Sequence, residues 1–243
     1  MKPLAKSRAA WSLLLALVLF GLGTARSGSV GADKPPADLR PTVAVLYFDY
    51  AGKDPQLEVL RIGLAQMLIT DLSAQRSFRL VERERIEAVL KELKLASMVK
   101  MDVQTAHRIG RVLGARYLVL GSYFNLRSTL RLDAHVIEVE TTLHLPGVGV
   151  DGVEDDVLSA ERQLAARLAQ SLATFLVAFP KAETPPASAK KARLSLKAAT
   201  QYSQALHALD RGERAVARGH LEAVVQAAPD FQLASSDLQR LMQ

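Results

Sequence analysis

The sequence predicts an α/β protein, with a mixed sheet and helices packed on it, followed by a small all-α helical-repeat module. Two apolar runs, VAVLYF at 43–48 and YLVLGSYF at 117–124, have the composition of strands covered on both faces. Helical periodicity lies between these runs, and strand–helix–strand order indicates crossovers within one sheet. A stretch rich in Pro, Ala and Lys at 181–193 then precedes a segment with helical periodicity alone.

The N-terminal segment has the layout of a secretory signal peptide. Three basic residues lie among the first eight, the apolar run WSLLLALVLFGL covers 11–22, and the small residues GTA follow at 23–25. The run is shorter than the roughly 18 residues of a membrane-spanning helix, so we expect cleavage after Ala25, with an uncleaved anchor as the alternative. The expected organisation is a signal peptide at 1–25, a flexible lead at 26–41, an α/β domain at 42–180, a linker at 181–193 and a helical module at 194–243.

The first helix is predicted to begin after Asp54-Pro55, because Asp is a good N-cap and Pro fits the first helical turn. Its apolar stripe is wide, which predicts deep burial. The stripe consists of Leu57, Leu60, Leu64, Leu68 and Leu72.

The charged stretch RLVERERIEAVL at 79–90 raises the question of a functional site. Apolar alternation up to Glu82 predicts a short strand, and from Arg83 apolar residues recur at helical spacing. Charges of both signs interleave, and Arg83 with Glu87, and Glu87 with Lys91, are four residues apart. We therefore interpret the stretch as a solvated helix start, with its pairs on the exposed face, and treat a catalytic carboxylate there as the lesser alternative.

Further along, Asp102 and Gly114 are predicted to cap a helix at its two ends. Alternation over 130–139 predicts a strand, and a slip in its phase predicts a bulge. Apolar residues within 143–150 can form the returning strand of a hairpin. The acidic run DGVEDD at 151–156 is expected to open a long helix rather than bind metal, because it lacks the ligand spacing of a calcium loop.

Composition excludes several classes of function. The chain has no cysteine, which removes disulfides, cysteine metal sites and thiol catalysis. Its formal charge of +6 falls to about +3 without the N-terminal basic residues, and aromatics make up 5%, so a nucleic-acid partner is not expected. No phosphate loop, dinucleotide fingerprint or hydrolase motif is present, so no catalytic residue and no cofactor are predicted. His135 and His144 can approach across a hairpin, but a metal site needs further ligands.

The 41–179 segment resembles the periplasmic α/β domain of the curli-secretion component CsgG, and the related N-terminal domain type of TolB-like proteins. The resemblance rests on LITDL at 68–72, VER at 81–83, LGARYLVLG at 113–121 and the strand at 132–140. It implies a non-enzymatic cell-envelope protein that oligomerises or serves an assembly. Two features depart from the curli channel: this chain has no cysteine for a lipid anchor, and its connections at 125–128 and 140–142 are too short for membrane-spanning hairpins.

The C-terminal segment is similar to one tetratricopeptide repeat, with small and apolar residues, a turn glycine and a final proline at the repeat's offsets. A solitary repeat rarely buries enough surface to be stable alone. We therefore expect the module to pack on the first domain or bind a protein segment. The candidate partner-binding residues are Leu206, Leu209, Leu221 and Val225.

Together these observations predict an exported protein of the periplasm that works through protein–protein interaction. Expected partners are envelope proteins or further copies of the chain, with peripheral association at the inner face of the outer membrane. Two alternatives stay open. One is a subunit or accessory of an outer-membrane secretion pore, and the other is an enzyme without recognised motifs.

Overall fold

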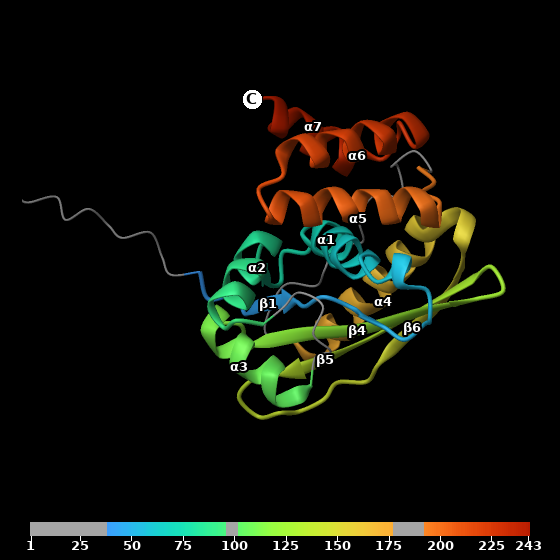
Figure 1. Ribbon diagram of the computed structural model, residues 1–243. Helices are drawn as coiled ribbons and strands as arrows, with labels where there is room; N and C mark the ends of the chain where they lie inside the picture. Colours follow the sequence, from blue (N-terminus) through green and yellow to red (C-terminus); the bar gives the residue numbers. More distant parts are fainter. Residues whose placement is uncertain (1–37, 96–101, 177–191) are drawn as a thin grey trace, which may run out of the picture. The chain divides into compact units, whose positions relative to one another are not determined.

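A mixed six-stranded sheet organises the N-terminal part of the molecule (Figure 1). The computed structural model describes residues 38–95, 102–176 and 192–243, and residues from Leu39 onward form one compact unit. The strand order is β3-β1-β4-β5-β6, and β2 also pairs with β4. The strands are β1 (Thr42–Val45), β2 (Asp49–Tyr50), β3 (Arg79–Leu80), β4 (Tyr117–Leu126), β5 (Thr129–Glu138) and β6 (Val148–Val153).

The sheet changes from parallel to antiparallel at β4. Strand β1 is parallel to both β3 and β4, whereas β4, β5 and β6 are antiparallel neighbours. A two-residue turn joins β4 to β5, and its residues Arg127 and Ser128 have φ values of 48° and 64°. Such positive φ values match the twist of a tight hairpin. The predicted strand at 117–124 and the α/β class are confirmed. The strand predicted at 43–48 is confirmed only in part, because β1 ends at Val45 and residues 46–48 lie between β1 and β2.

Helices cover the sheet on both sides. Helix α4 packs on β5 and β6 and also contacts α1, while α3 contacts β4. Gly110 on α3 sets the second contact, because a Cβ built there would lie 3.0 Å from Leu118 Cδ1. The helices of this part are η1 (Pro55–Leu57), α1 (Leu60–Leu72), α2 (Arg83–Glu92), α3 (Val103–Leu113), η2 (Glu154–Asp156) and α4 (Val157–Phe175).

Three further helices form the C-terminal helical module, as predicted. They are α5 (Leu196–Asp210), α6 (Arg214–Ala227) and α7 (Gln232–Met242). The Ser195 hydroxyl accepts a hydrogen bond from Ala198 N at the start of α5. Gly212, at φ 78°, turns the chain into α6, a backbone conformation that favours glycine. The likeness to a tetratricopeptide repeat stays a prediction.

The caps at Asp102 and Gly114 are confirmed, but several local predictions are wrong. Asp54 caps the short 3₁₀-helix η1, whereas α1 begins only at Leu60, after Val59, which makes no side-chain capping hydrogen bond. The β4–β5 register runs without a break from Thr129 to Glu138, so there is no bulge in that ladder. The change of phase arises because Val136 and Ile137 are both fully buried, on opposite faces of the sheet. The long helix was expected to open at 151–156, but it begins at Val157. Residues 148–156 form β6 and the 3₁₀-helix η2 instead.

The described residues contain no helix that is both long and apolar enough to cross a bilayer. The predicted signal peptide at 1–25 lies outside the described residues, as do nearly all of the lead and the linker. The domain boundaries therefore stay predictions.

Candidate interaction surfaces

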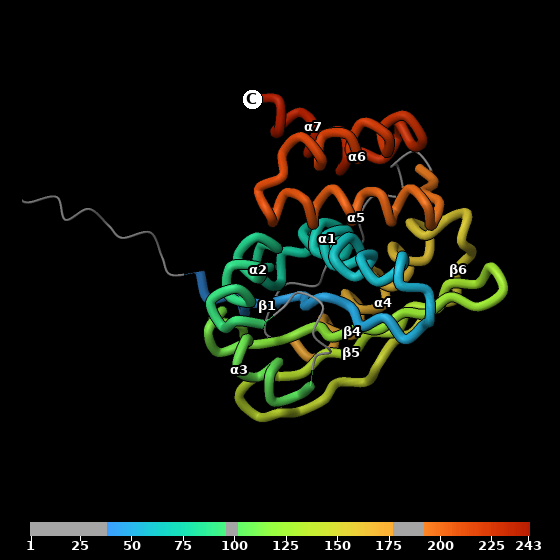
Figure 2. The backbone as a smooth tube through the Cα atoms, in the orientation of Figure 1, coloured from blue at the N-terminus to red at the C-terminus, as the bar shows by residue number. Residues whose placement is uncertain are grey.

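Helix α5 packs closely against α1, side by side in both backbone views (Figures 1 and 2). Gly63 permits this approach, because a Cβ built on it would lie 2.1 Å from Ser203 Oγ. Ser203 is fully buried and donates a hydrogen bond to Ala199 O at 2.8 Å. Any side chain at position 63 must therefore displace Ser203 or the helix that carries it.

A buried polar cluster of Tyr47, Arg83, Glu87 and Asp210, hereafter the Arg83 cluster, joins α2 to the end of α5. Arg83 Nη1 donates to Asp210 Oδ2 at 2.7 Å and to Tyr47 Oη at 3.3 Å. The Tyr47 hydroxyl in turn donates to Glu87 Oε2 at 3.0 Å. Lys91 Nζ adds a bond of 2.6 Å to the backbone oxygen of Asp210. The module is thus held to the first domain by polar contacts as well as by packing.

Burial sets the protonation states in the Arg83 cluster. It raises the pKa of Tyr47 far above the usual range, and the charge of Arg83 offsets only part of this rise. The Tyr47 hydroxyl therefore keeps its proton and remains a donor. Burial opposes the charge of Arg83, but the hydrogen bond to Asp210 holds the pKa of Arg83 above its usual value. Removing the charge of either Arg83 or Asp210 would leave the other charge buried without its partner.

The structure corrects the solvated interpretation of the stretch at 79–90. Arg83 is 2% exposed and Glu87 8% exposed, so they do not pair on an open face. Glu84 is exposed, as predicted, and Glu87 Oε1 lies 3.8 Å from Lys91 Nζ, which confirms that pair. The partner of Arg83 is 127 residues further along the chain, so local spacing carried no signal for the cluster.

The four predicted partner-binding residues lie at different depths. Leu206 and Leu221 are buried, whereas Leu209 and Val225 are partly buried and pack against the core. Their role in partner binding stays a prediction. Leu206 and Leu209 line a pocket of ≈ 190 Å³ between α1, α2 and the module, together with Gln66, Glu84, Arg214, Asp237, Arg240 and Leu241.

Polar contacts within the module fix the walls of this pocket. Tyr202 Oη donates to Asp237 Oδ2 at 2.9 Å, and Arg240 forms an ion pair with the same carboxylate. Arg214 Nη2 donates to Leu241 O at 2.8 Å. The pocket therefore has an apolar floor and walls whose charged groups already have partners.

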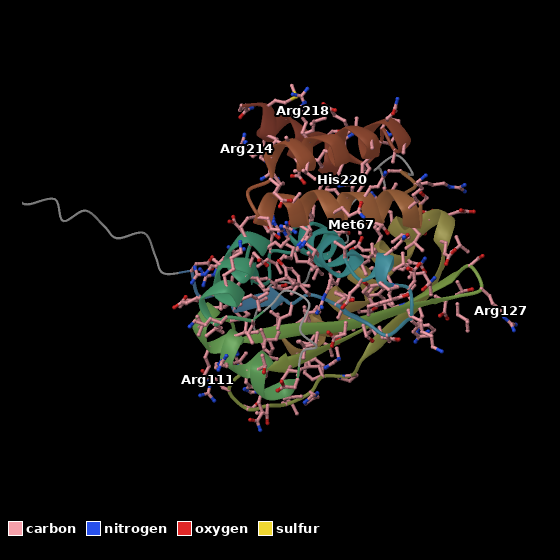
Figure 3. All side chains as sticks on the ribbon, in the orientation of Figure 1. Met67, Arg111, Arg127, Arg214, Arg218 and His220 are labelled. Carbon is pink, nitrogen blue, oxygen red and sulfur yellow. The ribbon has the colours of Figure 1, made fainter. Side chains whose placement is uncertain are left out.

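A second surface is the part of the β4–β5–β6 sheet away from α4, hereafter the open face. The register places its residues in rows across the three strands, with Leu126, Thr129 and Val153 in the outermost row. Leu126 is 63% exposed and Val153 57% exposed, which is high for apolar side chains. Figure 3 shows Arg127 pointing away from the sheet at the end of the hairpin.

A groove of ≈ 410 Å³ crosses the open face, and an ion network lies along it. Arg131 Nη2 donates to Asp133 Oδ1 at 2.7 Å, and Arg131 Nη1 to Asp151 Oδ2 at 3.1 Å. The guanidinium covers Gly149, because a Cβ built there would lie 2.2 Å from Nη2. These hydrogen bonds, to Asp133 first and then Asp151, raise the pKa of Arg131.

His135 and His144 do approach across the sheet, with ring centroids 5.7 Å apart and nearly parallel planes. Burial lowers the pKa of His135, and the neighbouring His144 lowers it further. Over 38–95, 102–176 and 192–243 there is no group of three or more His, Asp or Glu side chains placed to hold a metal ion. The two imidazole rings form a stacking contact.

The fold defines a mixed α/β domain that carries a docked three-helix module. The family model described as "Curli production assembly/transport component CsgG" matches residues 28–154, more than half of the 243-residue chain. The chain belongs to the CsgG family, as the sequence motifs predicted.

One curated relative is a Rhizobium meliloti (strain 1021) protein named "Putative adenylate cyclase 3". It is 25% identical over 151 residues, which are 62% of this chain. The match spans only 24% of that relative's length.

Several solved structures are similar to parts of the chain. Lipoprotein GNA1162 from Neisseria meningitidis has a TM-score of 0.43 and 10% identity, covering 53% of this chain and 94% of its own. The LpoB C-terminal domain from Salmonella enterica has a TM-score of 0.37 and 17% identity, covering 46% and 82%. TolB from Acinetobacter baumannii has a TM-score of 0.38 and 17% identity, covering 59% and 30%.

Proposed function

We propose that this chain is an exported cell-envelope protein that acts by binding other proteins during an assembly process, without catalysing a reaction. The family match over residues 28–154 supports an assembly role. The observation that carries the proposal is the docking of the helical module through the Arg83 cluster. Docking holds the module and the first domain in one arrangement, so that they present a preformed composite surface.

The charges on the two candidate surfaces favour binding over catalysis. Arg131 is engaged by Asp133 and Asp151, and Asp237 is engaged by Tyr202 and Arg240. Such mutually paired groups orient a surface, whereas a general acid or base must be available to a substrate. The cyclase name applies to a relative of which 24% is matched.

We place the protein in the periplasm, with peripheral association at the inner face of the outer membrane. The N-terminal sequence supports export, because basic, apolar and small residues follow one another in that order. Mass spectrometry of the native protein tests this step. A mature N-terminus after Ala25 is the expected result, and a chain that begins at Met1 contradicts cleavage.

Site-specific photocrosslinking tests the binding role. A crosslinking amino acid is placed at Leu209, beside the pocket of the module, or at Leu126 on the open face. The matched control is Arg218, an exposed residue of α6 that forms an ion pair with Glu222. We expect discrete adducts with envelope proteins from position 209 or 126 and none from 218. Equal labelling at all three positions, or no adduct at any, would contradict the proposal.

The transport wording of the family description favours one second candidate, an accessory subunit of a secretion pore. Fractionation separates the two roles. A peripheral binding protein is released from membranes by carbonate, whereas a pore subunit stays in the pellet.

A further inference from the structure

Strand β6 ends the sheet and has one free edge. Glu154 N donates to Ser128 O at 3.1 Å, which identifies these two as a hydrogen-bonded pair next to the β5–β6 ladder. Hydrogen-bonded and non-bonded pairs alternate in an antiparallel ladder. Gly149, Asp151 and Val153 therefore direct their backbone N–H and C=O groups away from β5. Within the described part of the chain, no backbone hydrogen bond reaches these groups from the outer side.

This edge lacks the features that usually prevent strand pairing. Its sequence, VGVDGV, contains no lysine and no proline, and its register with β5 is unbroken from Val148 to Val153. Pro146 and a one-residue shift in register, between the pairs Ile137–His144 and Ala134–Val148, lie just before the strand. The single charge, Asp151, is already paired with Arg131. Arg167 Nη1 donates to Gly149 O, but a carbonyl oxygen accepts two hydrogen bonds. An unprotected edge of this kind is a template for another strand.

We propose that the partner of this edge is a second copy of the chain, with the two β6 strands paired antiparallel about a two-fold axis at Val150. Outward-facing residues must oppose outward-facing residues, so the axis must pass through a residue, and only axes at Val150 and Asp151 pair five β6 residues of each copy. An axis at Asp151 sets two carboxylates directly opposite each other, which is unfavourable. An axis at Gly152 leaves most of β6 unpaired, whereas the axis at Val150 pairs residues 148–152 of both copies.

Charge complementarity supports the register centred on Val150. In this register Asp151 of the second copy lies opposite Gly149, and Gly149 is the residue that the Arg131 guanidinium covers. Each Arg131 then faces three carboxylates, Asp133 and Asp151 of its own chain and Asp151 of the second copy. At the ends of the pairing, Val153 lies opposite Gly147, where a built Cβ would meet nothing closer than 3.5 Å. The two sheets become one continuous sheet, with both open faces on the same side.

Spin-label distances in the full chain test the register. The chain has no cysteine, so Val153→Cys provides a single labelling site on an exposed side chain. With the axis at Val150, the two labelled backbones are six residues apart along paired strands, or about 20 Å. Axes at Asp151 and Gly152 give about 13 Å and about 7 Å by the same rise per residue. A distance near 20 Å, with a light-scattering mass twice the 26.4 kDa of one chain, supports the proposal. Either shorter distance, or a monomer at every concentration, overturns it.

A matched pair of variants tests the role of the edge itself. Asp151→Pro removes an N–H that the single chain does not use, and proline is tolerated in edge strands with this orientation. Asp151→Asn keeps the N–H and the size of the side chain. We expect the dimer Kd to rise by roughly 100-fold or more for Asp151→Pro, and to stay within about tenfold for Asp151→Asn. Circular dichroism and thermal melting confirm that both variants fold. If the oligomer keeps its mass with Asp151→Pro, the proposal is overturned. If that variant does not fold, the distance between the spin labels at position 153 tests the proposal independently.

Discussion

Glu161 on α4 is a carboxyl group buried without compensation. It is 1% exposed, and neither carboxyl oxygen has a hydrogen-bond partner among the residues that the structure describes. Burial raises the pKa of Glu161 well above its usual value, and the charge of Asp71 on α1 raises it further. Burial also raises the pKa of Asp71, while Arg162, with its Nε 3.8 Å from Asp71 Oδ2, partly offsets that rise.

The raised pKa of Glu161 predicts that this residue lowers the free energy of unfolding as pH rises. Glu161 has a higher pKa in the folded state than in the unfolded state. Below pH about 4.3, the pKa of an unfolded glutamate, the carboxyl group is protonated in both states and does not lower stability. As pH rises from that value through the pKa of the folded state, the free energy of unfolding decreases. Glu161→Gln should match the wild type at pH 4 and melt at a higher temperature at pH 8. Thermal melts across this range check it, with the exposed Glu92→Gln as control. Parallel melting curves for Glu161→Gln and wild type at every pH would falsify the prediction.

Arg83 and Glu84 are adjacent in sequence but differ in burial, which makes them a matched pair. Arg83→Met leaves the Asp210 carboxylate, 8% exposed, without its cation. We expect a loss of about 3–5 kcal/mol in the free energy of unfolding. Glu84→Gln changes an exposed side chain and should stay within about ±0.5 kcal/mol. Urea denaturation measures both, and similar small effects from the two variants would show that the Arg83 cluster contributes little.

The packing of α1 on α5 depends on one glycine. Gly63→Ala places a methyl group 2.1 Å from Ser203 Oγ and 3.2 Å from Ser203 Cβ, so we expect destabilisation despite the better helix propensity of alanine. Ser203→Gly removes both of these atoms, and the nearest remaining atom is then in the backbone, 3.5 Å from the methyl group. The double variant should recover part of the loss, with a coupling free energy of about 0.5–3 kcal/mol. A double-mutant cycle by chemical denaturation measures it, and strictly additive effects would show that the helices do not meet at this point.

Individual elements differ in how far their sequences predict them. The strands β1 and β4 and the caps at Asp102 and Gly114 follow from local composition, because the backbone requirements are local. The prediction of a bulge in β5 was wrong because Ile137 is buried on the face of the sheet that α3 reaches. Both faces of β5 are therefore apolar at this point. The Arg83 cluster could not be predicted, because its parts come from the segment after β1, from α2 and from α5.

The buried core of the C-terminal module continues into the first domain, through the contact between α5 and α1. Leu206 and Ser203 are buried where α5 meets α1. We therefore expect residues 194–243, expressed alone, to lack a cooperative thermal transition or to self-associate. Circular dichroism and sedimentation measure this, with the full chain as the reference. A stable monomeric fragment with a sharp melting transition would contradict the dependence on α1.

The bond between Arg83 and Asp210 also has a consequence for the order of synthesis. A chain that emerges N-terminus first has made β1, α1 and α2 long before Asp210 exists. Until then Arg83 has no carboxylate partner from α5, and the face of α1 around Gly63 has no covering helix. The first domain therefore cannot reach its final stability during translation, and the last fifty residues close it. Until those last residues are made, the first domain leaves apolar surface uncovered, and a chaperone can bind that surface for longer.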